Sequence, residues 1–234
     1  MRSIAKLMKD WQFTGPNGVT TAVELPHTWN ARDGQDGGND YWRGCCTYCT
    51  RFAAPVYDPA QQQVWLQFEG VNASAAVLLN GQQLCTHDGG YSTFRAEVTE
   101  LLQAENQLTV RVDNSVNDCV YPQKADFTFY GGIYRDVSLL VVNKNHIALG
   151  HFGDTGVKIT PTLKEGSADI QVETLVEGSG TVTVELLDAE GRTAAKGEGE
   201  NTFLHLDAPH LWNGIKDPYL YTCVVRLLQD GKPV

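Results

Sequence analysis

Residues 74–86 read Ser-Ala-Ala-Val-Leu-Leu-Asn-Gly-Gln-Gln-Leu-Cys-Thr, two short runs of strand-forming residues on either side of an Asn-Gly pair. Both residues of the pair tolerate a positive φ angle, which a two-residue type I′ turn requires at its central positions. The stretch therefore predicts an antiparallel hairpin, with strands over 74–79 and 83–86. Its turn is Asn80-Gly81, the strongest hairpin signal in the chain.

Short runs rich in Val, Thr and aromatic residues continue on both sides of this hairpin and are separated by turn residues. They predict further strands at 21–25, 45–52, 63–68, 107–112 and 136–142. Long helical periodicity is absent, and 42% apolar residues suffice for packed cores, so we expect an all-β protein. The long connection 113–134 lacks strand alternation, and such loops on β-sandwiches usually serve a purpose beyond joining strands.

A second unit begins near Asn143, with strands predicted at 156–163, 168–176, 181–187, 201–206 and 219–228. We therefore expect two domains, 1–142 and 143–234, the second an immunoglobulin-like sandwich, which normally needs about seven strands. Asp230-Gly231 should turn the chain into a last strand, but only residues 232–234 follow. The prediction is a sandwich that lacks its final strand, with an edge that is exposed or is covered by contacts in a homo-oligomer.

Composition excludes two classes of partner. The formal net charge of −10 would repel a polyphosphate backbone, so no nucleic acid is expected. Lys6 and Lys9 interrupt the apolar positions at the start of the chain, so no signal-peptide core forms, and no stretch approaches the length of a membrane span. We expect a cytoplasmic protein with no membrane partner.

Three of the six cysteines cluster at Cys45, Cys46 and Cys49. In a strand, Cys46 points to one face while the other two point to the opposite face. A tetrahedral zinc site also needs a second Cys/His pair, and the remaining cysteines are not paired. We interpret all six as reduced cysteines that act as small apolar residues, and predict neither a metal nor a cofactor.

Several stretches together resemble the sugar-binding domain that opens family 2 glycoside hydrolases, and they occur in the family's order. They are residues 23–30 with 33–44, residues 68–71 with 80–81 and 89–94, and residues 126–137, which are similar to the family's domain-closing signature. Residues 209–212 and 217–221 resemble the end of its immunoglobulin-like domain. The resemblance implies a jelly-roll (galactose-binding-like) β-sandwich followed by an immunoglobulin-like one. The run 33–39 resembles bacterial β-galactosidases most.

The family's chemistry requires parts that this sequence does not contain. Retaining hydrolysis needs two carboxyl groups about 5–5.5 Å apart. In the family both are glutamates on a (β/α)₈ barrel, which takes roughly 250 residues. The family's acid/base Glu follows an Asn, and no Asn here precedes a Glu. We predict no catalytic residue, and interpret Glu69, Glu173 and Glu185 as solvated residues on strand faces.

The resemblance does imply substrate contacts. In the family, an acidic residue of a first-domain loop hydrogen-bonds a hydroxyl of the non-reducing sugar, and the match places that role on Asp126. A carboxylate offers several acceptor sites to sugar hydroxyls. The alternative is that Asp126 caps a turn. Asn39 is the analogous candidate from the first loop, although a Gly-rich turn also uses Asn for its backbone.

Other residues of these loops have structural interpretations. Sugar rings stack on aromatic side chains, but Trp42 and Tyr91 adjoin strand starts and are expected in the core rather than on a sugar platform. Arg135 is expected to be buried and to join its loop to the sandwich by bidentate contacts. His27 is expected to hold the entry loop through hydrogen bonds.

The resulting hypothesis is the non-catalytic front part of a β-galactosidase-like enzyme, inactive alone. Its partners would be a β-linked galactoside and a downstream catalytic barrel. The alternative is a free-standing carbohydrate-binding module, since jelly rolls host many of these. A third reading is a structural spacer without a concave polar surface.

Overall fold

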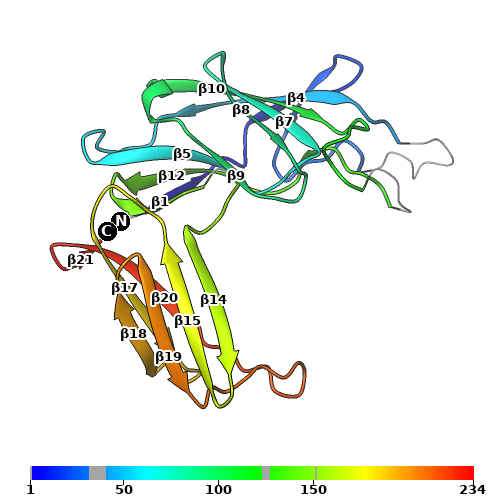
Figure 1. The fold of residues 1–234 in the computed structure, drawn as a ribbon. Helices are drawn as coiled ribbons and strands as arrows, with labels where there is room; N and C mark the ends of the chain where they lie inside the picture. The colour runs from blue at the N-terminus through cyan, green and yellow to red at the C-terminus, as the bar shows by residue number, and fades with distance from the viewer. Residues whose placement is uncertain (1, 32–40, 123–126, 151) are drawn as a thin grey trace. The chain divides into compact units, whose positions relative to one another are not determined.

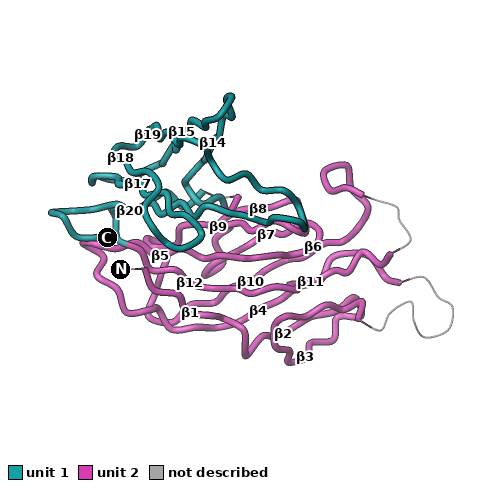
Figure 2. The backbone as a smooth tube through the Cα atoms, turned by 90° about the horizontal axis from the view of Figure 1, so that it is seen from below, with its two compact units in different colours: residues 1, 143–150, 154–234 teal, residues 2–142, 151–153 magenta. Residues whose placement is uncertain are grey.

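A computed structural model describes residues 2–31, 41–122, 127–150 and 152–234. The chain divides into two compact units, coloured separately in Figure 2. We call residues 2–142 with 151–153 the N-terminal sandwich, and residues 143–150 with 154–234 the C-terminal sandwich. Among the described residues, the only helical element is the 3₁₀ turn η1 (Thr99–Leu101), so the all-β prediction is confirmed. No described helix is long and apolar enough to cross a membrane.

The N-terminal sandwich has two main sheets, which Figure 1 shows as two layers. The six-stranded sheet has the order β3-β2-β4-β10-β7-β8, and the four-stranded sheet has the order β1-β12-β5-β9. A short ribbon pairs β6 with β11. The strands are β1 (Ser3–Lys6), β2 (Trp11–Thr14), β3 (Thr20–Val23), β4 (Cys45–Ala53), β5 (Gln62–Phe68), β6 (Val71–Asn72), β7 (Ser74–Leu79), β8 (Gln82–Asp88), β9 (Phe94–Glu97), β10 (Glu105–Asp113), β11 (Gly132–Ile133) and β12 (Val137–Asn143).

The core of this sandwich follows from strand alternation. Tyr48, Val110 and Val77 lie directly opposite one another on β4, β10 and β7, and all three are fully buried. In the four-stranded sheet, Phe68 of β5 lies opposite Phe94 of β9, and the two buried rings stack with centroids 4.8 Å apart. Each such large side chain contributes about 1.5–3 kcal/mol by burial. The row Tyr48–Val110–Val77 therefore fixes the register of β4, β10 and β7, because a slip of one strand by one residue would turn its buried side chain to the exposed face.

The predicted hairpin is present. Asn80 and Gly81 have φ angles of 51° and 83°, and β7 pairs antiparallel with β8. The sequence missed β1, β2 and β9, each four residues long, and the two-residue strand β6. All four residues of β1 are exposed, so this edge strand carries no alternation that a sequence pattern could reveal. The long connection also contains the two-residue strand β11, which was not expected.

The C-terminal sandwich stacks the sheet β14-β15-β19 on the sheet β18-β17-β20-β21, beside a short β13–β16 pair. Its core includes Val172, Val184 and Leu204. This is the expected immunoglobulin-like arrangement. Strand β18 was not predicted, because its sequence consists mainly of Ala, Lys and Gly, which do not favour strands. The strands are β13 (His146–Ile147), β14 (Val157–Lys164), β15 (Ser167–Thr174), β16 (Val176–Glu177), β17 (Thr181–Leu187), β18 (Thr193–Glu198), β19 (Asn201–Asp207), β20 (Thr222–Gln229) and β21 (Lys232–Pro233).

The expected turn after β20 is also present. Asp230 and Gly231 have φ angles of 48° and 75° and return the chain antiparallel to β20. The last strand, β21, has two residues and pairs only with Leu228 and Gln229. Within the described part of the chain, the rest of that edge of β20 has no strand partner.

Candidate functional site

Two buried asparagines organise the loops at one end of the N-terminal sandwich. Asn30 and Asn114 are both fully buried, and Nδ2 of Asn114 donates to Oδ1 of Asn30 at 3.1 Å across 84 positions of sequence. Oδ1 of Asn30 also accepts from the Gly131 amide at 2.8 Å, while its Nδ2 donates to the Trp42 carbonyl at 2.8 Å. One side chain therefore connects three loops.

Asn114 extends this network. Its Nδ2 donates to the Phe129 carbonyl at 2.9 Å, and its Oδ1 accepts from the Gly44 amide at 2.9 Å. Nε of Arg43 donates to the Asn114 carbonyl at 2.7 Å, and its guanidinium lies 5.0 Å from the centre of the Phe129 ring. Buried amides that use donors and acceptors together fix loop geometry tightly. We call residues 27–30, 41–44 and 127–133, held by this pair, the loop frame.

Close packing explains the two glycines of the loop frame. A Cβ at Gly131 would lie 2.0 Å from Cζ2 of Trp29, and one at Gly132 would lie 2.4 Å from the carbonyl oxygen of His27. Gly132 also has a φ of 139°, which L side chains rarely adopt. The hydroxyl of Thr28 donates to the Gly131 carbonyl at 2.7 Å. Any side chain at these two positions would push the loops apart.

His27 holds the entry loop, as the sequence predicted. Its Nδ1 lies 2.7 Å from the Tyr48 hydroxyl, and its backbone amide donates to the Ile133 carbonyl at 2.8 Å. Burial lowers the pKa of His27 and raises the pKa of Tyr48. Both groups are thus held neutral near pH 7, which suits a structural hydrogen bond rather than proton transfer.

Aromatic rings are exposed around the loop frame. The expectation that Trp42 and Tyr91 belong to the core was wrong, since they are 37% and 56% exposed. The Trp42 ring lies over Gly44, where an added Cβ would be only 2.5 Å from the ring. Trp42 therefore covers the backbone at Gly44 and does not enter the core of the sandwich. Phe127 and Tyr130 are 49% and 40% exposed. Together these rings provide apolar faces on which sugar C–H groups can stack.

Arg135 is exposed, so the expectation of a buried arginine was also wrong. Its Nη1 donates to the Tyr91 carbonyl at 3.3 Å and to the Glu69 carbonyl at 3.5 Å, and its guanidinium lies 5.3 Å from the Tyr134 ring. Both contacts come from the single nitrogen Nη1, so they are not the bidentate contacts that were expected. The side chain still joins neighbouring loops, from the surface.

Asp126 and Asn39, the two candidate sugar-contacting residues, lie outside the described residues, so their roles stay predictions. Glu173 and Glu185 occupy strand faces as expected, paired with Lys158 at 3.3 Å and Arg226 at 3.3 Å. No group of three or more His, Cys, Asp or Glu side chains within the described ranges could hold a metal ion.

The cysteine cluster follows the predicted alternation. Cys46 is 2% exposed and lies in the core, whereas Cys45 on the opposite face of β4 is exposed. All six cysteines are free thiols. Burial raises the pKa of Cys46 to about 12 and that of Cys85 to about 11. Thiols with such pKa values are poor nucleophiles.

Sequence reasoning missed the Asn30–Asn114 pair. Asn30 ends the stretch 23–30, and Asn114 comes directly after β10. Neither position in the sequence indicates that the two side chains contact each other. A buried side-chain amide looks like any turn asparagine in a sequence. Only the order of the family-like stretches hints at this contact. If the chain is assumed to fold as a jelly roll, that order places the three loops of the loop frame at the same end of the sandwich.

Two family models match the chain. The model "Glycosyl hydrolase 2 galactose-binding domain-like" matches residues 39–162, and the model "Glycosyl hydrolases family 2" matches residues 151–234. The chain belongs to glycoside hydrolase family 2. This confirms the family resemblance and the order of the two sandwich types.

Relatives within the family are named for two sugars. A β-glucuronidase of Bacteroides fragilis is 32% identical over 97% of this chain and 36% of its own length. The structure of an FMN-binding β-glucuronidase from Faecalibacterium prausnitzii has a TM-score of 0.90 and 34% identity over all of this chain and 38% of that one. A putative β-galactosidase structure from Bacteroides fragilis has a TM-score of 0.88 and 34% identity, over 99% and 39%. The chain thus spans about a third of the length of these relatives.

Proposed function

We propose that this chain is the non-catalytic front part of a retaining β-glycosidase, and that its loop frame borders the pocket for the terminal sugar. The observation that carries the proposal is the buried Asn30–Asn114 pair, which holds three loops in one arrangement while leaving aromatic rings exposed beside them. In this proposal Asp126 accepts a hydrogen bond from a sugar hydroxyl, with Asn39 as a second contact.

The names of the relatives leave two candidates for the terminal sugar, a β-glucuronide and a β-galactoside. Two of the relatives that match almost the whole chain are β-glucuronidases, which favours a terminal β-glucuronide. The run 33–39 and the similarity to a putative β-galactosidase favour a terminal β-galactoside. We propose the β-glucuronide first and keep the β-galactoside as the second candidate.

A chimera tests the proposal. This chain would replace the matching region of the Bacteroides fragilis β-glucuronidase, and hydrolysis of chromogenic β-glucuronide and β-galactoside would be measured. The Asp126→Asn variant should raise KM at least about tenfold, because a charge-assisted hydrogen bond is lost. Asp118→Asn, in an exposed part of the same connection, should leave KM unchanged. Equal kinetics for the two variants would refute the sugar contact.

The isolated 234-residue chain separates this proposal from a free-standing carbohydrate-binding module. We expect it to hydrolyse neither substrate and to bind glucuronate and galactose weakly by calorimetry, because the loop frame supplies one side of a pocket. Tight glycan binding by this chain would favour the binding module. Hydrolysis by it would overturn the non-catalytic role.

A further inference from the structure

The sheet β14-β15-β19 turns one side of its strands toward solvent, and we call that side the outer face. Strand alternation buries Ile170 and Leu204 in the core and places Phe203 on the outer face, where it is 70% exposed. The structure describes all three strands in full, and their other outward positions hold only Lys, Thr, Ser, Asp, Glu, Asn, Gln and His. The sheet includes neither β20 nor β21, so the outward residues are set by β14, β15 and β19 alone.

The strand register surrounds the Phe203 ring with planar polar groups. Gln171 of β15 lies directly opposite Phe203. Along β19, Asn201 and His205 are each two residues away and share the face, about 6.8 Å to either side. An exposed aromatic ring therefore has hydrogen-bonding side chains on three sides.

The first of these groups offers a donor and an acceptor beside the ring. Nε2 of Gln171 donates to Oδ1 of Asn201 at 3.0 Å, which holds the two amides next to each other on the surface. The remaining atoms are Oε1 of Gln171, an acceptor, and Nδ2 of Asn201, a donor. Neighbouring hydroxyls of a sugar can donate to the one and accept from the other.

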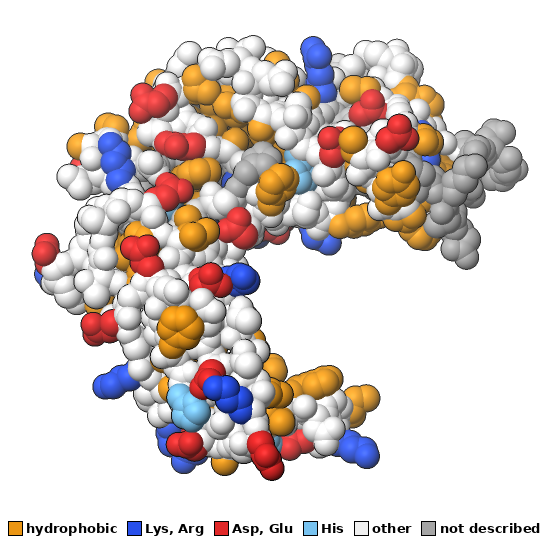
Figure 3. All heavy atoms as spheres, viewed as in Figure 1, with side chains coloured by type: hydrophobic (Ala, Val, Ile, Leu, Met, Phe, Trp, Pro, Cys, Tyr) orange, Lys and Arg blue, Asp and Glu red, His pale blue; other side chains and the backbone are white. Residues whose placement is uncertain are grey.

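Charge pairs occupy the rest of the outer face. Nδ1 of His205 lies 2.6 Å from Oδ1 of Asp169, and Lys164 pairs with the same carboxylate. Lys158 lies 3.3 Å from Glu173. Figure 3 shows acidic, basic and histidine side chains together over this sheet. The charges of the outer face therefore largely offset one another.

This chemistry separates three classes of partner. Protein interfaces have a core of several aromatic and aliphatic side chains, for which one ring is too little. A nucleic acid requires an excess of Lys and Arg, which paired charges do not provide. A carbohydrate stacks its apolar C–H groups on a ring and bonds its hydroxyls to polar groups beside it. The outer face matches the carbohydrate.

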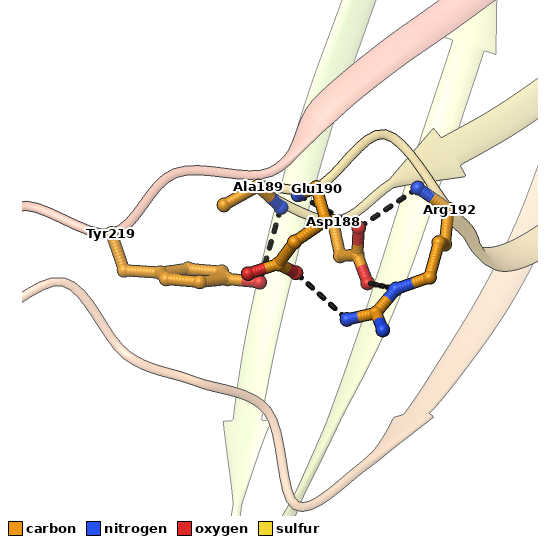
Figure 4. A network of polar contacts seen from close by, with 5 residues as sticks. All are labelled: Asp188, Ala189, Glu190, Arg192 and Tyr219. Atoms are coloured by element: carbon orange, nitrogen blue, oxygen red, sulfur yellow. Dashed lines mark hydrogen bonds and ion pairs between the residues drawn. The ribbon is translucent and has the colours of Figure 1, made fainter.

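An aromatic ring elsewhere in the same sandwich is used differently. At the turn between β17 and β18, Nε of Arg192 lies 2.9 Å from Oδ2 of Asp188 (Figure 4). The Tyr219 hydroxyl accepts a hydrogen bond from the Ala189 amide of this turn at 3.1 Å. The His210 ring stacks on Tyr219 with centroids 3.9 Å apart. The polar group and one face of Tyr219 thus serve the fold, whereas Phe203 presents its ring to solvent.

We propose that the outer face binds an extended, neutral, β-linked glycan chain, one sugar of which stacks on Phe203. The sugars on either side then lie over the Gln171–Asn201 pair and the His205–Asp169 pair, which bond their hydroxyls. An open sheet face suits a chain that passes across it, whereas a single sugar would need an enclosing pocket. One ring supports weak binding, so the surface retains the protein on a polysaccharide. The loop frame takes no part in this contact.

Affinity electrophoresis tests the proposal. The unmodified chain would be run in native gels that contain soluble β-glucan, β-xylan or β-galactan, and in a gel without glycan. We expect at least one of these glycans to slow its migration relative to a non-binding reference protein. Phe203→Ala should weaken the apparent affinity at least about tenfold, because the stacking contact is lost. Phe203→Trp should retain the affinity, since the larger ring offers the same kind of face.

The matched control is Phe152→Ala, because Phe152 of the N-terminal sandwich is 73% exposed and carries the same ring. It should migrate like the unmodified chain. Gln171→Ala should weaken the affinity about threefold or more, because a hydrogen bond beside the ring is lost. Circular dichroism would establish that each variant is folded.

Three results would overturn the proposal. One is migration of the unmodified chain that none of the three glycans slows. Another is equal retention of Phe203→Ala and the unmodified chain. If that retention is competed by galactose or glucuronate, the contact belongs to the loop frame, as in a free-standing carbohydrate-binding module. The third is a loss of retention in Phe152→Ala, which would place the contact on the N-terminal sandwich.

Discussion

Asn114 shows how much of the candidate site depends on single side chains. Its amide contacts Asn30, Phe129 and Gly44; the first two bonds are buried, and the bond from the Gly44 amide is partly buried. Asn114→Ala should lower the free energy of unfolding by about 2–4 kcal/mol, since several buried partners lose their bonds. Urea unfolding would measure it, and Asn17→Ala, which loses one exposed turn bond, is the control.

The coupling between the two asparagines is a separate prediction. A double-mutant cycle of Asn30→Ala and Asn114→Ala should give an interaction energy of about 0.5–3 kcal/mol, because the two side chains bond each other directly. Additive effects within experimental error would mean that the loops are held independently, and the loop frame would then not be one unit.

Gly131 tests the close packing of the same loops. Gly131→Ala would place a methyl group against the Trp29 ring and should destabilise the fold by about 1–3 kcal/mol. Gly15→Ala is the comparison, because its nearest neighbour, the Phe13 ring edge, is 3.3 Å away and can give. Thermal unfolding of both variants measures the difference. Similar melting temperatures would contradict the packing argument.

His27 gives a pH dependence of known sign. Burial lowers its pKa in the folded state below the ordinary value of 6.5. The unfolded chain therefore binds the proton more readily, and the contribution of neutral His27, complete above pH 6.5, is lost as pH falls through the folded pKa. Urea unfolding between pH 5 and pH 8 should show a steeper loss of stability in the unmodified chain than in His27→Gln. Parallel curves would exclude His27 as the source.

These residues also mark the limit of sequence reasoning at this scale. The role of His27 could be predicted, because it sits beside Pro26 with no catalytic partner nearby. The exposure of Trp42 could not, because it depends on Gly44 lying beneath the ring. Position next to a strand predicts proximity to the core, whereas burial is decided by contacts that are distant in sequence.

At the scale of elements, the Asn80-Gly81 turn also stabilises the fold through the hydrogen bonds of the Asn80 side chain. Nδ2 of Asn80 donates to the Leu101 carbonyl and to Oδ1 of Asn106, and its Oδ1 accepts from the Gln107 amide. Asn80→Gly keeps the turn's φ but loses these bonds. It should therefore cost about 1–3 kcal/mol on urea unfolding.

The other turn of this type is the matched control. Asp230 has nearly the same φ, 48°, and an exposed side chain, so Asp230→Gly should change stability by much less. Equal losses in the two variants would mean that the turn conformation, rather than the side-chain bonds of Asn80, carries the effect.

Element prediction succeeded where strands are long and half-buried. β4 and β10 alternate between buried and exposed positions along their length, which is the pattern that sequence analysis detects. β1 and β18 have no such pattern, because one is exposed throughout and the other carries small and charged residues. Their place in a sheet is set by the strands beside them.

At the scale of the whole molecule, the fold class and the family followed from the sequence, while the sugar did not. The order of turns, glycines and aromatic residues defines the two sandwiches, because backbone geometry requires those residue types. Sugar choice depends on a few loop side chains at the edge of a pocket. Relatives of similar fold that are named for different sugars show how little the scaffold constrains that choice.

The thiols provide a whole-molecule test of the fold. All six cysteines are free, and Cys45 and Cys119 are exposed while Cys46 is buried. A thiol reagent should modify Cys119 first in the native chain, because burial raises the pKa of Cys45 and slows its reaction. In denaturant without reductant, all six should react. A lower count would reveal a disulfide, and rapid reaction of Cys46 in the native chain would contradict the packing of β4 against the core.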